Sequence, residues 1–206
     1  MTPDLADLAA RAKGLVRDGR RALLGVTGAP GAGKSTLVDA LLEVLGVDGV
    51  GHVPMDGFHL ADVELDRLGR RDRKGAPDTF DVAGYASVLG RIRDDTADVV
   101  YAPGFERTLD QPIAASIAVP PSARLVLTEG NYLLHPGGLW PRVAGLLDEV
   151  WYVDLPDAVR LARLVARHTD YGKTPQEAAA WAHGSDQSNA ELVAATRSHA
   201  DLVVVR

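Results

Sequence analysis

An eight-residue segment with three glycines, set between an apolar run and an amphipathic run, constrains this chain more than any other feature. It reads Gly28-Ala29-Pro30-Gly31-Ala32-Gly33-Lys34-Ser35 and matches the pattern G-x-x-x-x-G-K-[ST]. Residues 22–27 before it have the composition of a short buried strand, and residues 35–45 after it have the apolar spacing of a helix. A strand, a glycine-rich loop and a helix in this order predict a loop that binds phosphate groups.

The chemistry of this loop favours a nucleoside triphosphate. Its glycines let successive backbone N–H groups approach phosphate oxygens at the positive end of the following helix. We expect Lys34 to reach the β and γ phosphates, and the Ser35 hydroxyl to complete the shell of a Mg²⁺ ion. The residues expected to bind the nucleotide are Gly28, Ala29, Pro30, Gly31, Ala32, Gly33, Lys34, Ser35 and Thr36.

Length and charge narrow the class of protein. The 206 residues suffice for one globular domain and no low-complexity linker divides them, so we expect a single domain over 1–206. A formal net charge of −6 disfavours a general nucleic-acid binder, because such proteins need a cationic field. The chain has no cysteine, which fits a cytoplasmic protein. It has neither a signal-peptide core at the N-terminus nor an apolar run of membrane-spanning length, so we expect no membrane partner.

Short apolar runs alternate with helical patterns, which is typical of a mostly parallel sheet covered by helices on both faces. The expected strands lie near 22–27, 50–55, 98–101, 124–128, 149–153 and 202–205. The expected helices lie near 4–18, 35–45, 81–94, 138–147, 156–168 and 175–197, the last opened by the capping box Thr174-Pro175-Gln176-Glu177. The stretches 56–80 and 102–123 are predicted to be irregular loops after strand ends, where such sheets bind ligands.

A carboxylate, Asp56, stands at the end of the second expected strand, within Val53-Pro54-Met55-Asp56-Gly57-Phe58-His59. Near a γ phosphate, a carboxylate can orient an acceptor hydroxyl and accept its proton. The alternatives for Asp56 are a helix cap or an outer partner of Mg²⁺. Phe58 and His59 would supply an apolar wall and a hydrogen-bonding edge for the acceptor.

A second carboxylate, Glu129, closes the buried run 124–128. A carboxylate at the end of an apolar strand commonly anchors Mg²⁺, directly or through water, so we expect Ser35 and Glu129 to hold the metal. Asn131 and Tyr132 follow on the loop, where they would face the acceptor or shape its pocket.

Three arginines, Arg160, Arg163 and Arg167, share one face of an expected helix at spacing i, i+3 and i+7. In a nucleotide-binding enzyme this face suits a mobile lid near 156–175 that neutralises the transferring phosphate and expels water. We favour Arg163 and Arg167, because Arg160 lies nearer the start of the helix. The alternative is a solvated face that pairs with nearby carboxylates.

The motifs Met55-Asp56-Gly57-Phe58-His59, Arg73-Lys74-Gly75-Ala76-Pro77-Asp78-Thr79-Phe80-Asp81 and Glu129-Gly130-Asn131-Tyr132-Leu133-Leu134 resemble the phosphoribulokinase and uridine kinase family of P-loop kinases. The likeness is strongest to bacterial nucleoside kinase-like or fructose-transport-associated kinases and more distant to type I pantothenate kinase. It runs from about Leu23 to the C-terminus.

The resemblance implies a P-loop NTPase fold, an α/β three-layer sandwich with a small helical lid. It implies ATP-dependent transfer of the γ-phosphoryl group to a hydroxyl of a sugar, nucleoside or vitamin precursor. In that family Asp56 occupies the position of the base, Arg73, Lys74 and Arg107 lie near the substrate, and homodimers are common.

Two other classes of protein use the same loop. A GTPase switch would need a guanine-reading Asn-Lys-x-Asp segment, which this sequence lacks, so adenine nucleotides are favoured. An ATPase or a nucleotide-dependent binding module would not need an acceptor pocket around Asp56, Arg73 and Arg107. Release of ADP that depends on an acceptor distinguishes a kinase from both.

Overall fold

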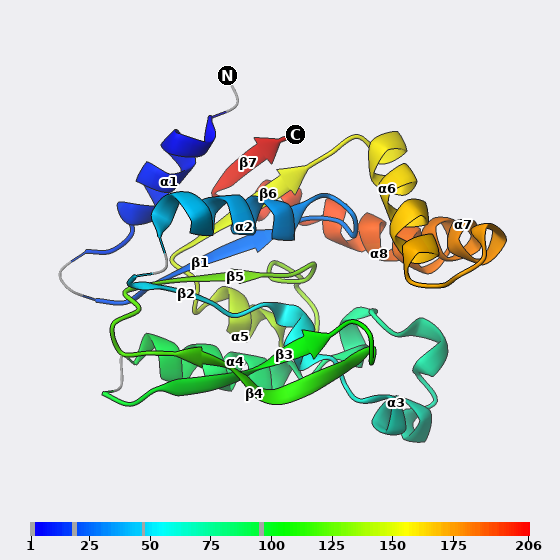
Figure 1. The fold of residues 1–206 in the computed structure, drawn as a ribbon, viewed down its shortest axis with the longest axis horizontal. Helices are drawn as coiled ribbons and strands as arrows, with labels where there is room; N and C mark the ends of the chain where they lie inside the picture. The colour runs from blue at the N-terminus through cyan, green and yellow to red at the C-terminus, as the bar shows by residue number, and fades with distance from the viewer. Residues whose placement is uncertain (1–2, 18–19, 47, 95–96) are drawn as a thin grey trace.

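A computed structural model of the chain describes residues 3–17, 20–46, 48–94 and 97–206. A five-stranded parallel sheet occupies its centre, with strand order β2-β5-β1-β6-β7 (Figure 1). The strands are β1 (Ala22–Thr27), β2 (Val50–His52), β5 (Leu125–Glu129), β6 (Glu149–Asp154) and β7 (Leu202–Val205). The expected α/β class with a mostly parallel sheet is confirmed.

Both faces of the sheet are covered, because alternate side chains of each buried strand point to opposite faces. On one face, Leu24 and Val26 of β1 pack against α1 (Leu5–Lys13) and α2 (Lys34–Leu45). On the other face, Leu23 of β1 joins a core with side chains of three further helices. These helices are α4 (Val82–Arg93), α5 (Trp140–Ala144) and α8 (Ser185–Ala194). The result is a three-layer arrangement, visible in Figure 1.

The two stretches predicted to be irregular contain regular structure. The expected strand at 98–101 is β3 (Val100–Glu106), which pairs antiparallel with β4 (Gln111–Val119) in a separate two-stranded hairpin. The stretch 56–80 contains α3 (Asp62–Leu68) and three 3₁₀ turns. Both predictions were wrong because few residues of these elements are buried, so the elements lack the apolar periodicity that marks a buried helix or strand.

The region expected to form a lid begins as predicted and then differs. The helix expected at 156–168 is α6 (Asp157–Asp170), and the capping box at Thr174 opens α7 (Pro175–His183). The single helix expected over 175–197 is instead two helices, α7 and α8, which meet at Gly184. After proline, glycine is the residue that least favours a helix interior, so a break between helices at this position is expected.

Three other element ends differ from the expected ones. The strand expected over 50–55 stops at His52, because Pro54 has no N–H to donate. The helix expected near 138–147 is the shorter α5. The helix expected over 4–18 ends at Lys13, and residue 18 lies outside the described residues. No helix in the described ranges has both the length and the apolar character that crossing a membrane requires.

A buried arginine joins β1 to the layer beneath it. The guanidinium of Arg21, whose exposed fraction is 3%, donates to the carbonyl oxygens of Ala123 at 2.6 Å and Ile92 at 2.7 Å. It also donates to those of Pro120 at 3.3 Å and Pro121 at 3.2 Å. The Ile92 carbonyl lies in the last turn of α4, where backbone acceptors lack helical partners. Arg21 therefore satisfies backbone oxygens of two segments that are far apart in sequence.

Replacing Arg21 with methionine should destabilise the fold, because the substitution leaves these buried carbonyl oxygens without their donor. We expect a loss of about 3 kcal/mol in the free energy of unfolding, which lowers the melting temperature by roughly 6–12 °C for a chain of this size. Thermal and urea unfolding followed by circular dichroism measure both. The neighbouring Arg20 is exposed, so Arg20→Met should change the free energy by less than about 0.5 kcal/mol. Equal effects of the two substitutions would contradict the role of Arg21.

Candidate active site

The glycine-rich loop connects β1 to α2 and is packed too closely for side chains. At Gly28, which has φ of 151°, a Cβ atom would lie 2.7 Å from the carbonyl oxygen of Val153. At Gly31, which has φ of 80°, it would lie 2.7 Å from Cγ of Leu164 on α6. Gly33 precedes α2 with φ of 95°, and no side chain caps the first turn of this helix. The N–H groups of that turn are therefore available to an anion.

The ammonium group of Lys34 is buried among three oxygens. Nζ donates to the carbonyl oxygens of Gly28 at 3.0 Å and Ala29 at 3.1 Å. It also donates to Oδ1 of Asn131 at 2.6 Å. Asn131, predicted to face an acceptor, thus contacts the lysine that is expected to meet the phosphates.

Burial changes the protonation of Lys34. Removal from water lowers its pKa to about 8, even though the carboxylates of Glu129 and Asp56 favour the charged form. The same burial raises the pKa of Glu129, against the effect of Lys34. Lys34 and Glu129, which carry opposite charges, therefore lie together in a poorly hydrated space at the N-terminus of α2.

Ser35 and Glu129, the two expected metal ligands, are in contact. The Ser35 hydroxyl donates to Oε1 of Glu129 at 2.9 Å, because β5 lies beside β1 and ends at the level of the loop. Hydroxyl and carboxylate oxygens suit Mg²⁺, which keeps water and phosphate oxygens in most of its shell. The described residues contain no group of three or more acidic or histidine side chains that would hold a metal alone. The pair therefore fits Mg²⁺ held jointly with a nucleotide.

Asp56 lies in the 3₁₀ turn Met55–Phe58 that follows β2. Gly57 lets the hairpin approach this turn, since a Cβ atom there would lie 2.1 Å from the carbonyl oxygen of Pro103 in β3. The hairpin also carries Arg107, whose guanidinium lies 3.7 Å from Oδ2 of Asp56. Both side chains are partly exposed, at 38% for Asp56 and 47% for Arg107. The pair is thus accessible to a small molecule.

The two residues after Gly57 have different surroundings: His59 lies between aromatic rings near Asp56, and Phe58 is part of the core. His59 donates from Nδ1 to the Asp56 carbonyl oxygen at 2.8 Å, and its ring lies 4.1 Å from that of Phe80 and 4.9 Å from that of Phe105. Burial lowers the pKa of His59, which favours the neutral ring. Phe58 is 5% exposed and packs against Tyr85 in the core.

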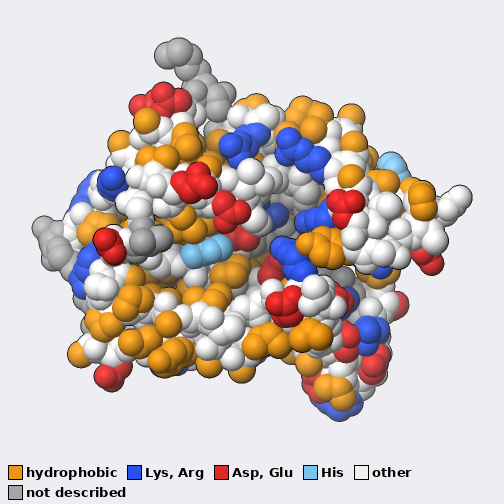
Figure 2. All heavy atoms as spheres, viewed as in Figure 1, with side chains coloured by type: hydrophobic (Ala, Val, Ile, Leu, Met, Phe, Trp, Pro, Cys, Tyr) orange, Lys and Arg blue, Asp and Glu red, His pale blue; other side chains and the backbone are white. Residues whose placement is uncertain are grey.

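An open cleft of about 720 Å³ joins the loop, the hairpin and α6. Figure 2 shows a hollow on this face with Lys and Arg side chains gathered at its rim. Three predicted arginines line the cleft, namely Arg107 from the hairpin and Arg163 and Arg167 from α6. The other lining residues are Gly31, Gly33, Lys34, Ser35, Thr36, Leu164, Asp170 and Tyr171. Three segments far apart in sequence thus meet around one cationic space.

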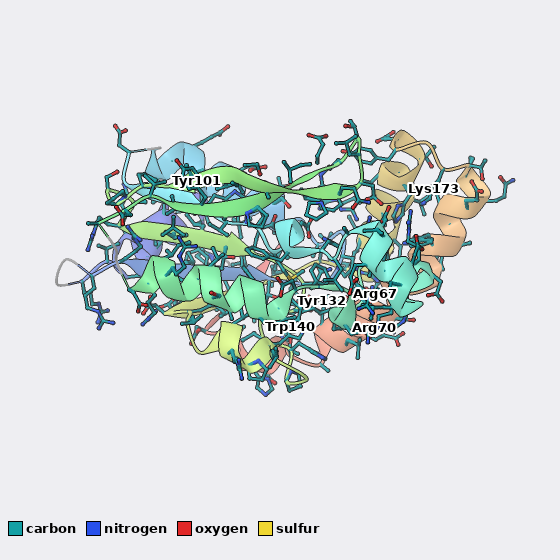
Figure 3. The ribbon with its side chains drawn as sticks, turned by 90° about the horizontal axis from the view of Figure 1, so that it is seen from below. Arg67, Arg70, Tyr101, Tyr132, Trp140 and Lys173 are labelled. Atoms are coloured by element: carbon teal, nitrogen blue, oxygen red, sulfur yellow. The ribbon has the colours of Figure 1, made fainter. Side chains whose placement is uncertain are left out.

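Three of the predicted substrate residues are engaged elsewhere. Arg73 donates to Oδ1 of Asp78 at 2.5 Å within its own loop. Lys74 binds carboxylates of α3 and of the hairpin turn. The Tyr132 hydroxyl donates to the Gly75 carbonyl oxygen at 2.6 Å. Its ring lies 5.5 Å from that of Trp140, and Figure 3 labels both. None of the three lines the cleft.

Arg160 is buried, which its position in the sequence did not indicate. It is 1% exposed, and its guanidinium donates to Asp157 at 2.9 Å, to the Pro30 carbonyl oxygen at 3.4 Å and to Gln187 of α8. It therefore links the glycine-rich loop to both α6 and α8. Its spacing put it on one face with Arg163 and Arg167, but spacing alone does not tell which members of a face are buried.

The comparisons with known proteins agree with this site. Residues 8–53, which hold the loop and its flanks, match the family model of the methylmalonyl Co-A mutase-associated GTPase MeaB. Over 215 residues the chain is 33% identical to "Putative uridine kinase C227.14" of Schizosaccharomyces pombe, covering 98% of this chain and 92% of the relative.

Two solved structures of kinases have the same fold as this chain. The crystal structure of a "putative fructose transport system kinase" from Silicibacter sp. TM1040 is 37% identical with a TM-score of 0.86, covering 95% of this chain and 98% of that one. YFH7 from Saccharomyces cerevisiae, described as a P-loop kinase with a circular permutation, shares the fold with a TM-score of 0.81 at 19% identity over 99% of both chains. Since two relatives at 33% and 37% identity extend over nearly the whole chain, it belongs to the P-loop kinases of the uridine kinase and phosphoribulokinase type.

Proposed function

We propose that this protein transfers the γ-phosphoryl group of ATP to a hydroxyl group of a small metabolite. The observation that carries the proposal is the approach of Asp56 and Arg107 at 3.7 Å beside the cleft that Lys34 and Ser35 line. The first two residues come from segments with no role in holding a nucleotide loop. A carboxylate and an arginine at this place suit an acceptor, because one can take the proton of a hydroxyl group while the other binds a polar group of the same molecule.

In the proposed reaction, backbone N–H groups of the loop and the Lys34 ammonium bind the phosphates. The acceptor hydroxyl loses its proton to Asp56 while its oxygen bonds to the γ phosphorus. The bond between the γ phosphorus and the bridging oxygen breaks, and ADP leaves. Arg163 and Arg167 of α6 balance the negative charge on the moving group. Mg²⁺, held by Ser35 and Glu129 with the nucleotide, would neutralise charge on the phosphate oxygens.

The family supports a kinase over an ATPase or a switch. The match to a GTPase family model is confined to residues 8–53, and the sequence lacks a guanine-reading Asn-Lys-x-Asp segment. The relatives named above suggest nucleosides or sugars as acceptors, and vitamin precursors stay in the proposed set. A homodimer and a cytoplasmic location stay predictions of the sequence alone.

A screen of sugars, nucleosides and vitamin precursors by coupled ADP release tests the proposal. We expect one class of acceptor to accelerate ADP release from MgATP. With that acceptor, Asp56→Asn should lower turnover by about 10² to 10⁴, the usual contribution of a general base, while ATP affinity stays unchanged within about threefold. The control is Asp66→Asn on α3, an exposed carboxylate away from the cleft, which should keep full turnover.

Two results would contradict this proposal in different ways. Full turnover by Asp56→Asn would remove the base assignment but leave a kinase. A rate of ADP release that no acceptor changes would favour an ATPase instead.

The low pKa of Lys34 makes nucleotide affinity depend on pH. The free protein loses the Lys34 proton at about pH 8, and bound phosphates favour the charged form, so binding takes up a proton above that pH. Affinity for a non-hydrolysable ATP analogue should stay level between pH 7 and 8 and then fall by up to about tenfold per pH unit. Calorimetry in buffers of different ionisation enthalpy measures both affinity and proton uptake.

Lys34→Arg provides the control, because arginine stays charged over this range. Its affinity should be independent of pH even where its absolute value is lower. A level profile for the unaltered protein up to pH 9.5 would show that Lys34 keeps its proton when free.

A further inference from the structure

The ammonium group of Lys74 is fastened between two segments. Nζ lies 2.8 Å from Oδ1 of Asp62, 2.7 Å from Oδ2 of Asp110 and 2.5 Å from the Asp110 carbonyl oxygen. Its side chain is only 11% exposed, although Asp110 is 65% exposed. An ammonium group has three N–H donors, and here each one has an acceptor.

These contacts join the start of α3 to the turn of the β3–β4 hairpin. Asp62 is the first residue of α3, and its N–H donates to the side-chain oxygen of Gln111 in β4 at 3.2 Å. The Lys74 ammonium also lies 5.7 Å from the ring centre of Phe105 in β3. Figures 1 and 3 both show the hairpin turn beside the segment that contains α3.

Lys74 holds one residue of the turn through two contacts. Asp110 has φ of 53°, a left-handed conformation that aspartate adopts more readily than most residues with a Cβ atom. Lys74 binds both its side chain and its backbone carbonyl oxygen. The two contacts therefore fix the Asp110 side chain and backbone to the same ammonium group.

Arg107 lies three residues before Asp110 in the same turn and lines the cleft beside Asp56. Its own contact to Asp56 is long, at 3.7 Å, and both partners are exposed. Exposed ion pairs of this kind contribute about 0–1 kcal/mol, too little to hold a hairpin turn in place. The position of Arg107 thus depends on the contacts at Asp110.

We infer that Lys74 is a positioning residue, which fastens the hairpin turn to α3 and thereby holds Arg107 over the acceptor side of the cleft. This inference rests on the proposed function insofar as Arg107 faces an acceptor. It differs from the role that the family resemblance implies for Lys74, since Lys74 is bound to Asp62 and Asp110 and does not line the cleft.

Limited proteolysis with trypsin tests the fastening without any acceptor, because Arg107 is itself a cleavage site in the turn. Lys74→Met should speed cleavage after Arg107 by about tenfold or more, as release of the turn raises the population of open states. Asp110→Asn, at an exposed position that the fold tolerates, should speed it in the same direction. Mass spectrometry identifies the fragments, and unchanged thermal unfolding confirms that the variants are folded.

Arg71→Met is the matched control. Arg71 also binds the Asp62 carboxylate, at 2.7 Å, and its second ion-pair partner is Asp66 of α3 rather than the hairpin turn. Its substitution should leave cleavage after Arg107 within about twofold of the unaltered protein. Lys74→Arg, which keeps the charge, should restore protection.

Once the screen identifies an acceptor, kinetics distinguish positioning from general damage. Lys74→Met should raise KM for the acceptor by about tenfold while kcat and ATP affinity change little, and Lys74→Arg should reverse the effect. The inference is overturned if Lys74→Met and Asp110→Asn both leave cleavage after Arg107 unchanged, or if Arg71→Met accelerates it equally. If no acceptor is found, the proposed function fails while proteolysis still decides whether Lys74 holds the turn.

Discussion

A buried positive charge at the head of α2 organises the cleft. An ammonium group removed from water without partners would cost several kcal/mol, so the surrounding segments must present oxygen atoms to Lys34. The loop does so with the carbonyls of Gly28 and Ala29, and the segment after β5 does so with Asn131. Strand β5 pairs with β1 up to Glu129, which brings Glu129 to Ser35, and the Asn131 contact joins the segment after β5 to the same site. One buried charge thus gathers groups that follow two paired strands.

The sequence predicts the nucleotide half of this site better than the acceptor half. Strand β1 and helix α2 are correctly predicted because a continuous apolar run and an amphipathic helix flank a motif of fixed geometry. Strand β4 was missed because its exposed residues carry no core pattern, and its pairing is visible only once β3 is placed. The burial of Arg160 and of Lys74 was not predicted for a related reason, since the burial of a charged side chain depends on partners from distant segments.

The two halves are held together by different forces. Around the loop, a Cβ atom at Gly28 or Gly31 would overlap a backbone oxygen of β6 or the Leu164 side chain of α6. Around Asp56 and Arg107, the hairpin is secured by ion pairs and hydrogen bonds between partly exposed groups. The first arrangement tolerates little change in shape at these two glycines. The second belongs to a separate two-stranded sheet, which suits the acceptor side of the proposed kinase site.

Arg160 attaches α6 to the loop near one end of the helix, so a tilt of the helix moves its other end most. Arg160 is fixed near the first turn, at the Pro30 carbonyl oxygen, whereas Arg167 lies seven residues further along, about 10 Å at 1.5 Å per residue. A tilt of about 5° around that fixed end therefore displaces Arg167 by about 1 Å, enough to lengthen a hydrogen bond to a phosphate oxygen beyond the usual limit. A small change in how the loop holds Arg160 is thus amplified at the far end of the helix, where the charge on a transferred group would develop.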